Sequence, residues 1–203
     1  GKHLTDRFNA GFSNSYNGAG SALRTTSSTG AMTLKKSGIQ GNQARTYSAW
    51  IKSDGPQAWP QGYFLSLGEG GLGNQSALVI GSQYNRGLPF AAPIFGMDNN
   101  YANVQIVSTA PFHGNWNHVA VTYYEKLAYA KMFVNGVQVD VTLPAGYSDP
   151  ERMLNTADGG ISISRFLDPN DTDGPQGRGF AGLVDNVRIY NRALSAAEVS
   201  QLY

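Results

Sequence analysis

The closing part of the chain limits the fold more narrowly than any other segment. Residues Leu183–Tyr190 alternate in the manner of a strand that turns its Val and Ile side chains to one face. The residues that follow fit a short helix, because Ser195 is a favourable N-cap and Glu198, three positions later, completes a capping box. The apolar positions of this helix form one stripe: Leu194, Val199 and Leu202. The segment therefore predicts a strand that is followed directly by a capped helix.

Short alternating segments separated by turn residues recur along the rest of the chain. With 203 residues, 41% hydrophobic content and 25 Gly, the composition fits one all-β domain over residues 1–203, with residues 1–15 as an irregular N-terminal segment. Asn135 and Gly136, between two such segments, predict a hairpin with a type I′ turn. The other predicted strands are Tyr63–Leu67, Ala77–Ile80, Ile94–Met97, Val104–Ser108 and Ile161–Ser164.

The charge balance and the lack of cysteine narrow the classes of function. Lys and Arg total 15 against 14 Asp and Glu, so the net charge of +1 gives no broad field that would attract nucleic acid or an anionic membrane surface. With no Cys, the chain has neither a disulfide nor a thiol nucleophile. No apolar run is long enough to span a bilayer, and no signal peptide begins the sequence. We therefore expect a soluble module of a longer protein, with a neutral partner.

Several motifs in combination carry a resemblance to a known family. Residues 16–23 read YNGAGSAL, residues 44–52 read ARTYSAWIK, and residues 114–123 read GNWNHVAVTY. Together with the Asn-Gly hairpin and the closing strand and helix, they closely resemble the laminin G-like jelly rolls of the concanavalin A-like lectin/glucanase superfamily. The resemblance covers about residues 16–203. It implies an antiparallel β-sandwich of jelly-roll topology with a short C-terminal helix, and it implies that Trp50 belongs to the core.

The resemblance also implies a function. Jelly rolls of this kind act as non-catalytic carbohydrate-binding modules of secreted bacterial multidomain proteins. The expected partners are therefore a polysaccharide or glycan and covalently linked catalytic or adhesion domains, and the expected location is secreted or at the cell surface. Laminin G-like domains also bind proteins, so an adhesion or interaction domain is the alternative. A polysaccharide lyase or glycoside hydrolase with unusual residues is a third hypothesis.

The spacing of the glutamates and the position of His118 do not match the catalytic residues of enzymes with this fold. β-Glucanases on this fold use paired glutamates on one strand, but Glu69, Glu125, Glu151 and Glu198 have no second carboxylate at the required spacing. The motifs of jelly-roll lyases do not occur in the sequence either. His118 lies inside a predicted strand, which is typical of a hydrogen-bonded structural histidine. We therefore expect no enzyme activity and assign no catalytic residue.

Recognition of a sugar requires exposed aromatic faces beside planar polar side chains, and several loop segments offer both. Trp59 lies between Pro and Gln residues, outside the family's core tryptophan positions, which fits either a ligand platform or a plug that packs the loop. Two later segments combine an aromatic residue with amide and charged side chains, although each also fits an ordinary turn. The candidate ligand-binding residues are Trp59, Tyr63, Tyr84, Asn85, Arg86, Asp98, Asn99, Asn100, Tyr101 and Arg178.

An acidic segment late in the chain is a candidate calcium site. Asp168, Asp171 and Asp173 lie within a few residues of one another and offer the hard oxygen ligands that Ca²⁺ prefers. The spacing does not match an EF-hand, because no Glu closes a loop of the required length. A solvated loop with Asx-turns explains the same residues without a metal.

A second calcium candidate is implied by the resemblance. Related jelly rolls use an Asp in the position of Asp185 to hold a structural Ca²⁺, and Asp6 or Asn17 would be its partner here. A carboxylate beside apolar residues is costly unless it is paired. The alternatives for Asp185 are an ion pair with an arginine such as Arg188 or hydrogen bonds from loop amides.

Overall fold

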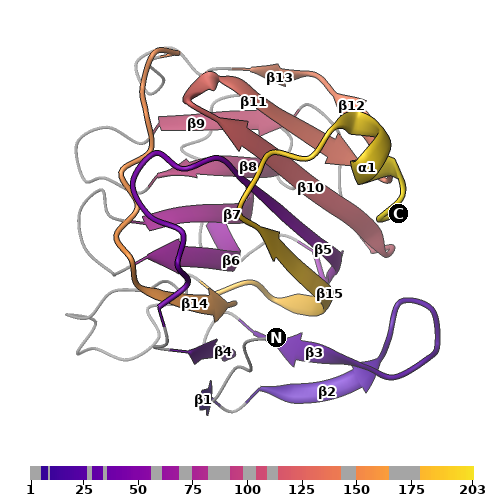
Figure 1. Cartoon of the computed structure of the whole chain (residues 1–203). Coiled ribbons are helices and arrows are strands. Elements are labelled where there is room, and N and C mark those ends of the chain that lie inside the picture. The colour runs from indigo at the N-terminus through magenta and orange to yellow at the C-terminus, as the bar shows by residue number, and fades with distance from the viewer. Residues whose placement is uncertain are drawn as a thin grey trace.

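The computed structural model of the protein is a sandwich of two antiparallel β-sheets (Figure 1). Among the residues that the structure describes, one sheet has eight strands and the other has seven. This architecture, together with the short C-terminal helix, confirms the predicted jelly-roll β-sandwich. The described part of the chain contains no helix long and apolar enough to cross a membrane. The described residues are 6–8, 10–26, 29–33, 36–55, 61–68, 75–81, 92–97, 104–108, 114–142, 150–164 and 179–203.

Strand β5 (Arg45–Ser53) lies at the centre of the seven-stranded sheet, between β10 (Asn117–Tyr124) and β15 (Gly182–Tyr190). The closing strand predicted from the sequence is therefore present and lies inside the sheet, because β15 pairs with β5 on one side and with β3 on the other. The order of the strands is β12-β11-β10-β5-β15-β3-β2. The remaining strands are β12 (Val137–Val139), β11 (Lys126–Val134), β3 (Ser21–Thr25) and β2 (Gly11–Asn14).

The eight-stranded sheet has the order β1-β4-β14-β6-β7-β8-β9-β13. It contains the predicted strands Tyr63–Leu67, Ala77–Ile80, Ile94–Met97, Val104–Ser108 and Ile161–Ser164, whereas the hairpin around Asn135-Gly136 belongs to the seven-stranded sheet. Its strands are β1 (Asp6–Phe8), β4 (Gly30–Thr33), β14 (Gly160–Ile163), β6 (Gln61–Gly68), β7 (Gln75–Gly81), β8 (Ala92–Met97), β9 (Val104–Ser108) and β13 (Val141–Thr142).

The N-terminal segment contradicts one expectation. Residues 1–15 were predicted to be irregular, but β1 and β2 both lie within them and each forms an edge of its sheet. All the side chains of β2 are exposed. A strand without a buried face carries no alternation of apolar and polar residues, and the sequence pattern therefore could not reveal it.

The core between the sheets follows from the alternation of side chains along each strand. Tyr47, Ala49 and Ile51 of β5 point into the main buried cluster, and Val119 and Val121 of β10 do the same. The opposing sheet supplies large apolar side chains, and those that are fully buried or nearly so are Phe64, Leu65, Leu67, Leu78 and Phe95.

Trp50 lies on the outer face of the seven-stranded sheet, so the prediction that it belongs to the core is wrong. Its neighbours Ala49 and Ile51 are both in the core cluster, whereas Trp50 is only half-buried and is not part of that cluster. Successive side chains of a strand point to opposite faces, which places Trp50 on the face turned away from the eight-stranded sheet.

Two local predictions are confirmed. Asn135 and Gly136 have positive φ angles of 51° and 77°, as a type I′ turn requires. Helix α1 (Ala196–Ser200) has the predicted capping box between Ser195 and Glu198. Val199 of the helix and Leu194 before it pack against the outer face of β10 and β11, in the region where Figure 1 shows α1 in front of the sheet.

Arg45, the first residue of β5, is fully buried, and its hydrogen-bond partners among the described residues are all neutral. Its Nε donates to the carbonyl of Gln43 at 2.8 Å, and its Nη1 donates to Oγ1 of Thr156 at 2.7 Å. Its Nη2 donates to the carbonyl of Gly41 at 2.8 Å. A buried guanidinium is tolerated only when its donors are satisfied, and through a further bond to Oγ of Ser76 Arg45 joins residues 41–45 to Thr156 and to β7 at this end of the sandwich.

Replacing Arg45 with Lys should therefore destabilise the fold. An ammonium cannot reproduce the planar set of donors, and we expect the free energy of unfolding to fall by about 2–4 kcal/mol in a urea titration. The matched control is Arg24→Lys, which alters a half-exposed ion pair and should cost less than about 1 kcal/mol. Equal unfolding midpoints for the two variants would contradict this account of Arg45.

Candidate functional site

One end of the sandwich gathers most of the segments that carry the candidate ligand residues. Gln61, the first residue of β6, pairs with Gly81 at the end of β7, which in turn pairs with Ala92 at the start of β8. These three residues flank segments 56–60 and 82–91. We call this end of the sandwich the loop end.

Two more segments return to the loop end. The amide of Phe180 donates to the carbonyl of Tyr63 at 3.2 Å, and the amide of Asp54 donates to the carbonyl of Ala181 at 3.2 Å. The amide of Gly114 donates to the carbonyl of Ser53, also at 3.2 Å. The described residues that follow segments 109–113 and 165–178 are therefore bonded to the same end of the two sheets.

The segment of Asp98, Asn99, Asn100 and Tyr101 is flanked by residues at the opposite end. Met97 of β8 pairs with Val104 of β9, and Met97 also pairs with Ser76 at the start of β7. Residues 98–103 thus connect two strands at the end that also holds Arg45, whose guanidinium contacts Ser76. The candidate ligand residues are accordingly divided between the two ends of the sandwich.

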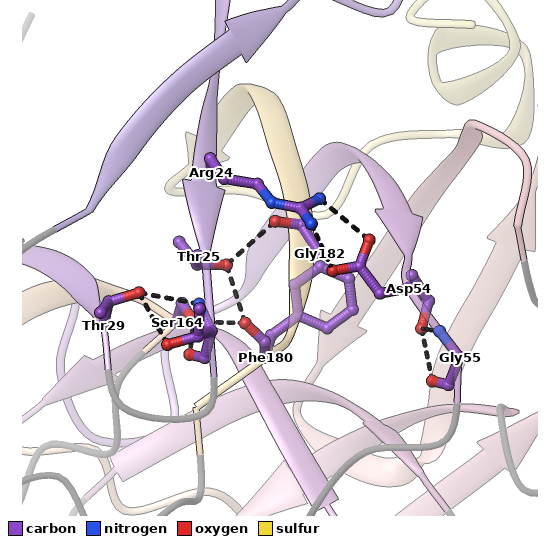
Figure 2. Close-up of polar contacts among 10 residues, drawn as sticks. Arg24, Thr25, Thr29, Asp54, Gly55, Ser164, Phe180 and Gly182 are labelled. Atoms are coloured by element: carbon purple, nitrogen blue, oxygen red, sulfur yellow. Dashed lines mark hydrogen bonds and ion pairs between the residues drawn. The ribbon is translucent and has the colours of Figure 1, made fainter.

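A buried polar network fixes the base of the loop end (Figure 2). The carbonyl of Phe180 accepts hydrogen bonds from Oγ1 of Thr25 at 2.7 Å and from Oγ of Ser164 at 2.8 Å. The ring of Phe180 is fully buried and packs edge-on against Phe64, with centroids 5.9 Å apart. These contacts join the end of β3, the residue after β14 and the residues before β15.

Gly182 shows how tightly this base is packed. A Cβ atom at this position would lie 2.3 Å from the carbonyl oxygen of Lys52 and 2.6 Å from the ring of Phe180. Any side chain larger than hydrogen would separate β15 from β5 or displace the buried ring. The start of β15 therefore requires glycine.

An ion pair stands at the rim of the same network (Figure 2). Both terminal nitrogens of Arg24 reach the carboxylate of Asp54, at 2.9 Å and 2.8 Å, and both side chains are about half exposed. Oγ of Ser53 donates to the carbonyl of Gly55 at 2.9 Å. An exposed pair adds little stability, but these contacts fix the first residues of the loop that leads to Trp59.

Besides Asp185, three of the candidate ligand and metal residues lie among the described residues. Tyr63 is only 4% exposed. Its buried ring offers no face to a sugar, so we withdraw it from the ligand residues. Asn17 is exposed in the turn before β3, and Asp6 is the first residue of β1. The others lie outside the described residues: Trp59, Tyr84, Asn85, Arg86, Asp98, Asn99, Asn100, Tyr101, Arg178, Asp168, Asp171 and Asp173.

Asp185 anchors the N-terminal turn by hydrogen bonds. Its Oδ2 accepts from Oγ of Ser15 at 2.6 Å and from the amide of Tyr16 at 3.3 Å, and its Oδ1 accepts from the amide of Asn186 at 2.7 Å. The alternative of hydrogen bonds from loop amides is thus the one observed. The guanidinium Nε of Arg188 instead donates to Oδ1 of Asn186 at 3.2 Å.

These contacts give Asp185 partners within the chain, and calcium at this carboxylate stays a prediction. Each carboxylate oxygen accepts at least one hydrogen bond from the chain, so the fold holds Asp185 in place without a metal. Oδ1 of Asn17 accepts from the amide of Ala19 at 2.9 Å and also lies 2.9 Å from Oγ of Ser15, whose single proton is shared with the closer Oδ2 of Asp185. Asp6 lies on the edge strand of the other sheet. Within the described ranges, no group of three or more His, Cys, Asp or Glu side chains could hold a metal ion.

Five aromatic rings gather on the outer face of the seven-stranded sheet, a group that we call the aromatic cluster. Trp50 stacks with Tyr16 at a centroid distance of 4.3 Å and with Tyr203 at 5.4 Å. Trp116 meets Tyr16 edge-on at 6.4 Å, and His118 lies 5.6 Å from Trp50. The cluster therefore joins the N-terminal turn, the central strands and the residues after α1.

His118 is a structural histidine, as predicted. It is only 1% exposed, and its Nε2 is 2.8 Å from Oγ of Ser48. Burial, and to a lesser extent the positive charge of Arg188, lower the pKa of His118 from 6.5 to about 4. A serine and a histidine at this distance resemble part of a hydrolytic triad, but within the described ranges Nδ1 of His118 has no carboxylate or other partner. The pair is thus a hydrogen bond within the sheet.

A comparison with protein families now connects this geometry to known proteins. The profile of the concanavalin A-like lectin/glucanases superfamily matches residues 26–200. The chain belongs to this superfamily. A search among curated proteins finds no match.

Solved structures share the concanavalin A-like fold at low sequence identity. Domain 4 of an extracellular arabinanase from Geobacillus stearothermophilus, in complex with arabinotriose, is 16% identical with a TM-score of 0.64, over 95% of this chain and 80% of that chain. The CBM40 of the Ruminococcus gnavus IT-sialidase is 18% identical with a TM-score of 0.60, over 89% and 95%. The binding domain of botulinum neurotoxin DC, in complex with rat synaptotagmin II, is 11% identical with a TM-score of 0.63, over 97% and 45%.

The order of the predicted strands also predicts that the candidate loops lie at two different ends of the sandwich. Consecutive antiparallel strands turn at alternate ends of a sheet, so the order of the predicted strands already places residues 98–103 away from residues 82–91. The aromatic cluster was not predicted. Its members Tyr16, Trp116 and Tyr203 come from three distant parts of this concanavalin A-like chain, and only the folded sheet brings them together.

The lowered pKa of His118 predicts that stability depends on pH. Because the folded protein binds the imidazole proton less readily than the unfolded chain, the free energy of unfolding should fall as the pH is lowered from about 6.5 to about 4 and then level off for this group. Urea titrations across this range measure the slope. In His118→Gln this part of the slope should disappear, and an unchanged slope in that variant would show that other groups cause it.

Proposed function

We propose that this chain is a non-catalytic carbohydrate-binding module that binds a glycan at the loop end. The observation that carries the proposal is the strand register, which brings the residues flanking the segments of Trp59, Tyr84–Arg86 and Arg178 to one end of the sandwich. The buried contacts of Phe180 with Thr25, Ser164 and Phe64 hold the strand ends beside these segments in place. Loops on a rigid scaffold are a common setting for ligand recognition.

The chemistry of these segments supports a sugar as the ligand. Trp59 and Tyr84 supply faces for the C–H surface of a pyranose, while Asn85, Arg86 and Arg178 supply planar hydrogen-bonding groups. The arabinanase domain with arabinotriose and the sialidase CBM40 share the fold and support the same reading. A weak module of this kind acts by raising the effective concentration of a linked catalytic or adhesion domain at a polysaccharide, which is consistent with a secreted or cell-surface protein.

A protein-binding adhesion domain is the second candidate. It is favoured by the structural similarity to the binding domain of botulinum neurotoxin DC, whose solved structure is a complex with rat synaptotagmin II. The fold supports either function, because function resides in the site rather than in the sandwich. We rank it below glycan binding because the candidate loops combine aromatic, amide and guanidinium side chains.

A glycan array followed by affinity measurements on point variants tests the glycan proposal. Trp59→Ala should weaken binding of the best array glycan by about tenfold or more, as expected for the loss of a central aromatic anchor. Tyr101→Ala is the matched control and should bind as well as the unchanged protein, because its segment is flanked by residues at the opposite end. Binding of no glycan at high protein concentration would contradict the proposal.

Calcium is a separate proposal, for which the segment of Asp168, Asp171 and Asp173 offers the more direct test. If this segment binds Ca²⁺ in the folded state only, removal of the ion with EDTA should lower the Tm, and added Ca²⁺ should restore it. The variant Asp171→Asn should abolish the difference, whereas Asp158→Asn, which alters an acidic residue paired with Lys36, should leave it intact. A Tm that does not respond to EDTA would remove calcium from the description of this domain.

A further inference from the structure

Two buried nitrogen atoms in the aromatic cluster have no hydrogen-bond partner among the residues that the structure describes. They are Nε1 of Trp50 and Nδ1 of His118, in rings whose centroids are 5.6 Å apart. Buried polar groups in folded proteins nearly always have a partner, because leaving one without a partner is costly. Two such atoms in neighbouring rings therefore call for polar partners that the described residues do not supply.

The chemistry of the two rings selects a hydroxyl as the missing partner. An indole N–H only donates, so the missing partner of Trp50 must accept a hydrogen bond. Nε2 of His118 already interacts with Oγ of Ser48, and depending on the tautomer the remaining Nδ1 is a donor or an acceptor. A hydroxyl accepts from Trp50 and either donates to or accepts from His118, so it suits both tautomers. A metal cation does not suit the site, because the indole N–H offers it no lone pair.

The ring of Tyr203 covers this part of the cluster. It stacks on Trp50 with an interplanar angle of 21° and lies 6.3 Å from His118, centroid to centroid. Tyr203 is itself 59% exposed, whereas His118 beneath it is 1% exposed. Tyr203 also stands beside Gly136, because a Cβ atom added to that glycine would lie 3.2 Å from Cβ and 3.3 Å from Cδ1 of Tyr203. A solvent-exposed ring thus occupies the stacking position over Trp50.

We propose that the outer face of the seven-stranded sheet holds a second sugar subsite in the place that Tyr203 covers. A neutral sugar stacks on the indole of Trp50 in place of Tyr203, and hydroxyls of the same glycan reach over the ring edges to bind Nε1 of Trp50 and Nδ1 of His118. Tyr203 acts as a cover that the sugar displaces. The inference rests on the proposed glycan-binding function, but it uses described residues of a sheet face and none of the loop residues.

Nuclear magnetic resonance on the ¹⁵N-labelled protein tests the subsite. The probe is a mixture of short neutral arabino-, xylo-, cello- and manno-oligosaccharides. The indole N–H signal of Trp50 and the ring nitrogens of His118 should shift with the mixture, and Trp50→Phe, which keeps a ring but removes the N–H, should lose the shift of His118. Tyr203→Ala should tighten this binding by about tenfold, because the sugar no longer competes with the cover. Tyr124→Ala, which alters another exposed tyrosine of the same sheet, is the control and should not change it.

The signals of Trp59, Trp50 and His118 distinguish the subsite from binding at the loop end and from a bound water. If the indole signal of Trp59 shifts while those of Trp50 and His118 do not, the subsite is wrong and the glycan function at the loop end stands. If no signal shifts with this mixture, the subsite is wrong, and the glycan array decides separately on the loop end. If the indole N–H of Trp50 instead shows magnetisation transfer from a bound water and no response to sugar, the missing partner is an immobilised water only and the subsite is wrong.

Discussion

Strand β5 is the element on which the rest of the sandwich depends, because both of its edges and both of its faces are in use. Its edges pair with β10 and β15 along most of its length. One face sends Tyr47, Ala49 and Ile51 into the core, and the other sends Ser48 and Trp50 to the outer face. A shift of one residue in its pairing would exchange the two faces, which would bury Trp50 in the core and expose its neighbours.

The sequence predicted the parts of the fold whose signals are local. The Asn135-Gly136 turn, the capping box of α1 and the existence of the closing strand each depend on residues close together in the chain, and all three were found. The predicted alternation of that strand was not found, because residues 182–184 are all buried and a bulge lies between Asp185 and Arg188. The two faces of β5 could not be told apart in the same way. The segment ARTYSAWIK has an aromatic ring on each face, so its pattern indicates a strand without saying which ring is in the core.

The candidate site was harder to predict because its geometry depends on contacts between distant residues. Asp185 accepts hydrogen bonds from Ser15 and Tyr16, which are about 170 positions away, and no pattern near Asp185 reveals whether such a carboxylate meets donors or a cation. Polar loops show themselves by composition, but their position at one end or the other comes from strand pairing. The family resemblance identified the sandwich correctly, and it carried over a core role for Trp50 that the outer-face cluster does not support.

The position of β15 has a consequence for how the protein is made. This strand comes last in the chain, yet it lies between β5 and β3 inside the seven-stranded sheet. During synthesis, β3 and β5 leave the ribosome long before their common neighbour, and both keep an unpaired edge until residues 182–190 emerge. Nascent chains of this domain thus pass through a stage in which two open strand edges can meet those of another chain. Fast synthesis of the residues up to 190, or a chaperone that shields these edges, protects the sheet until β15 pairs with β3 and β5.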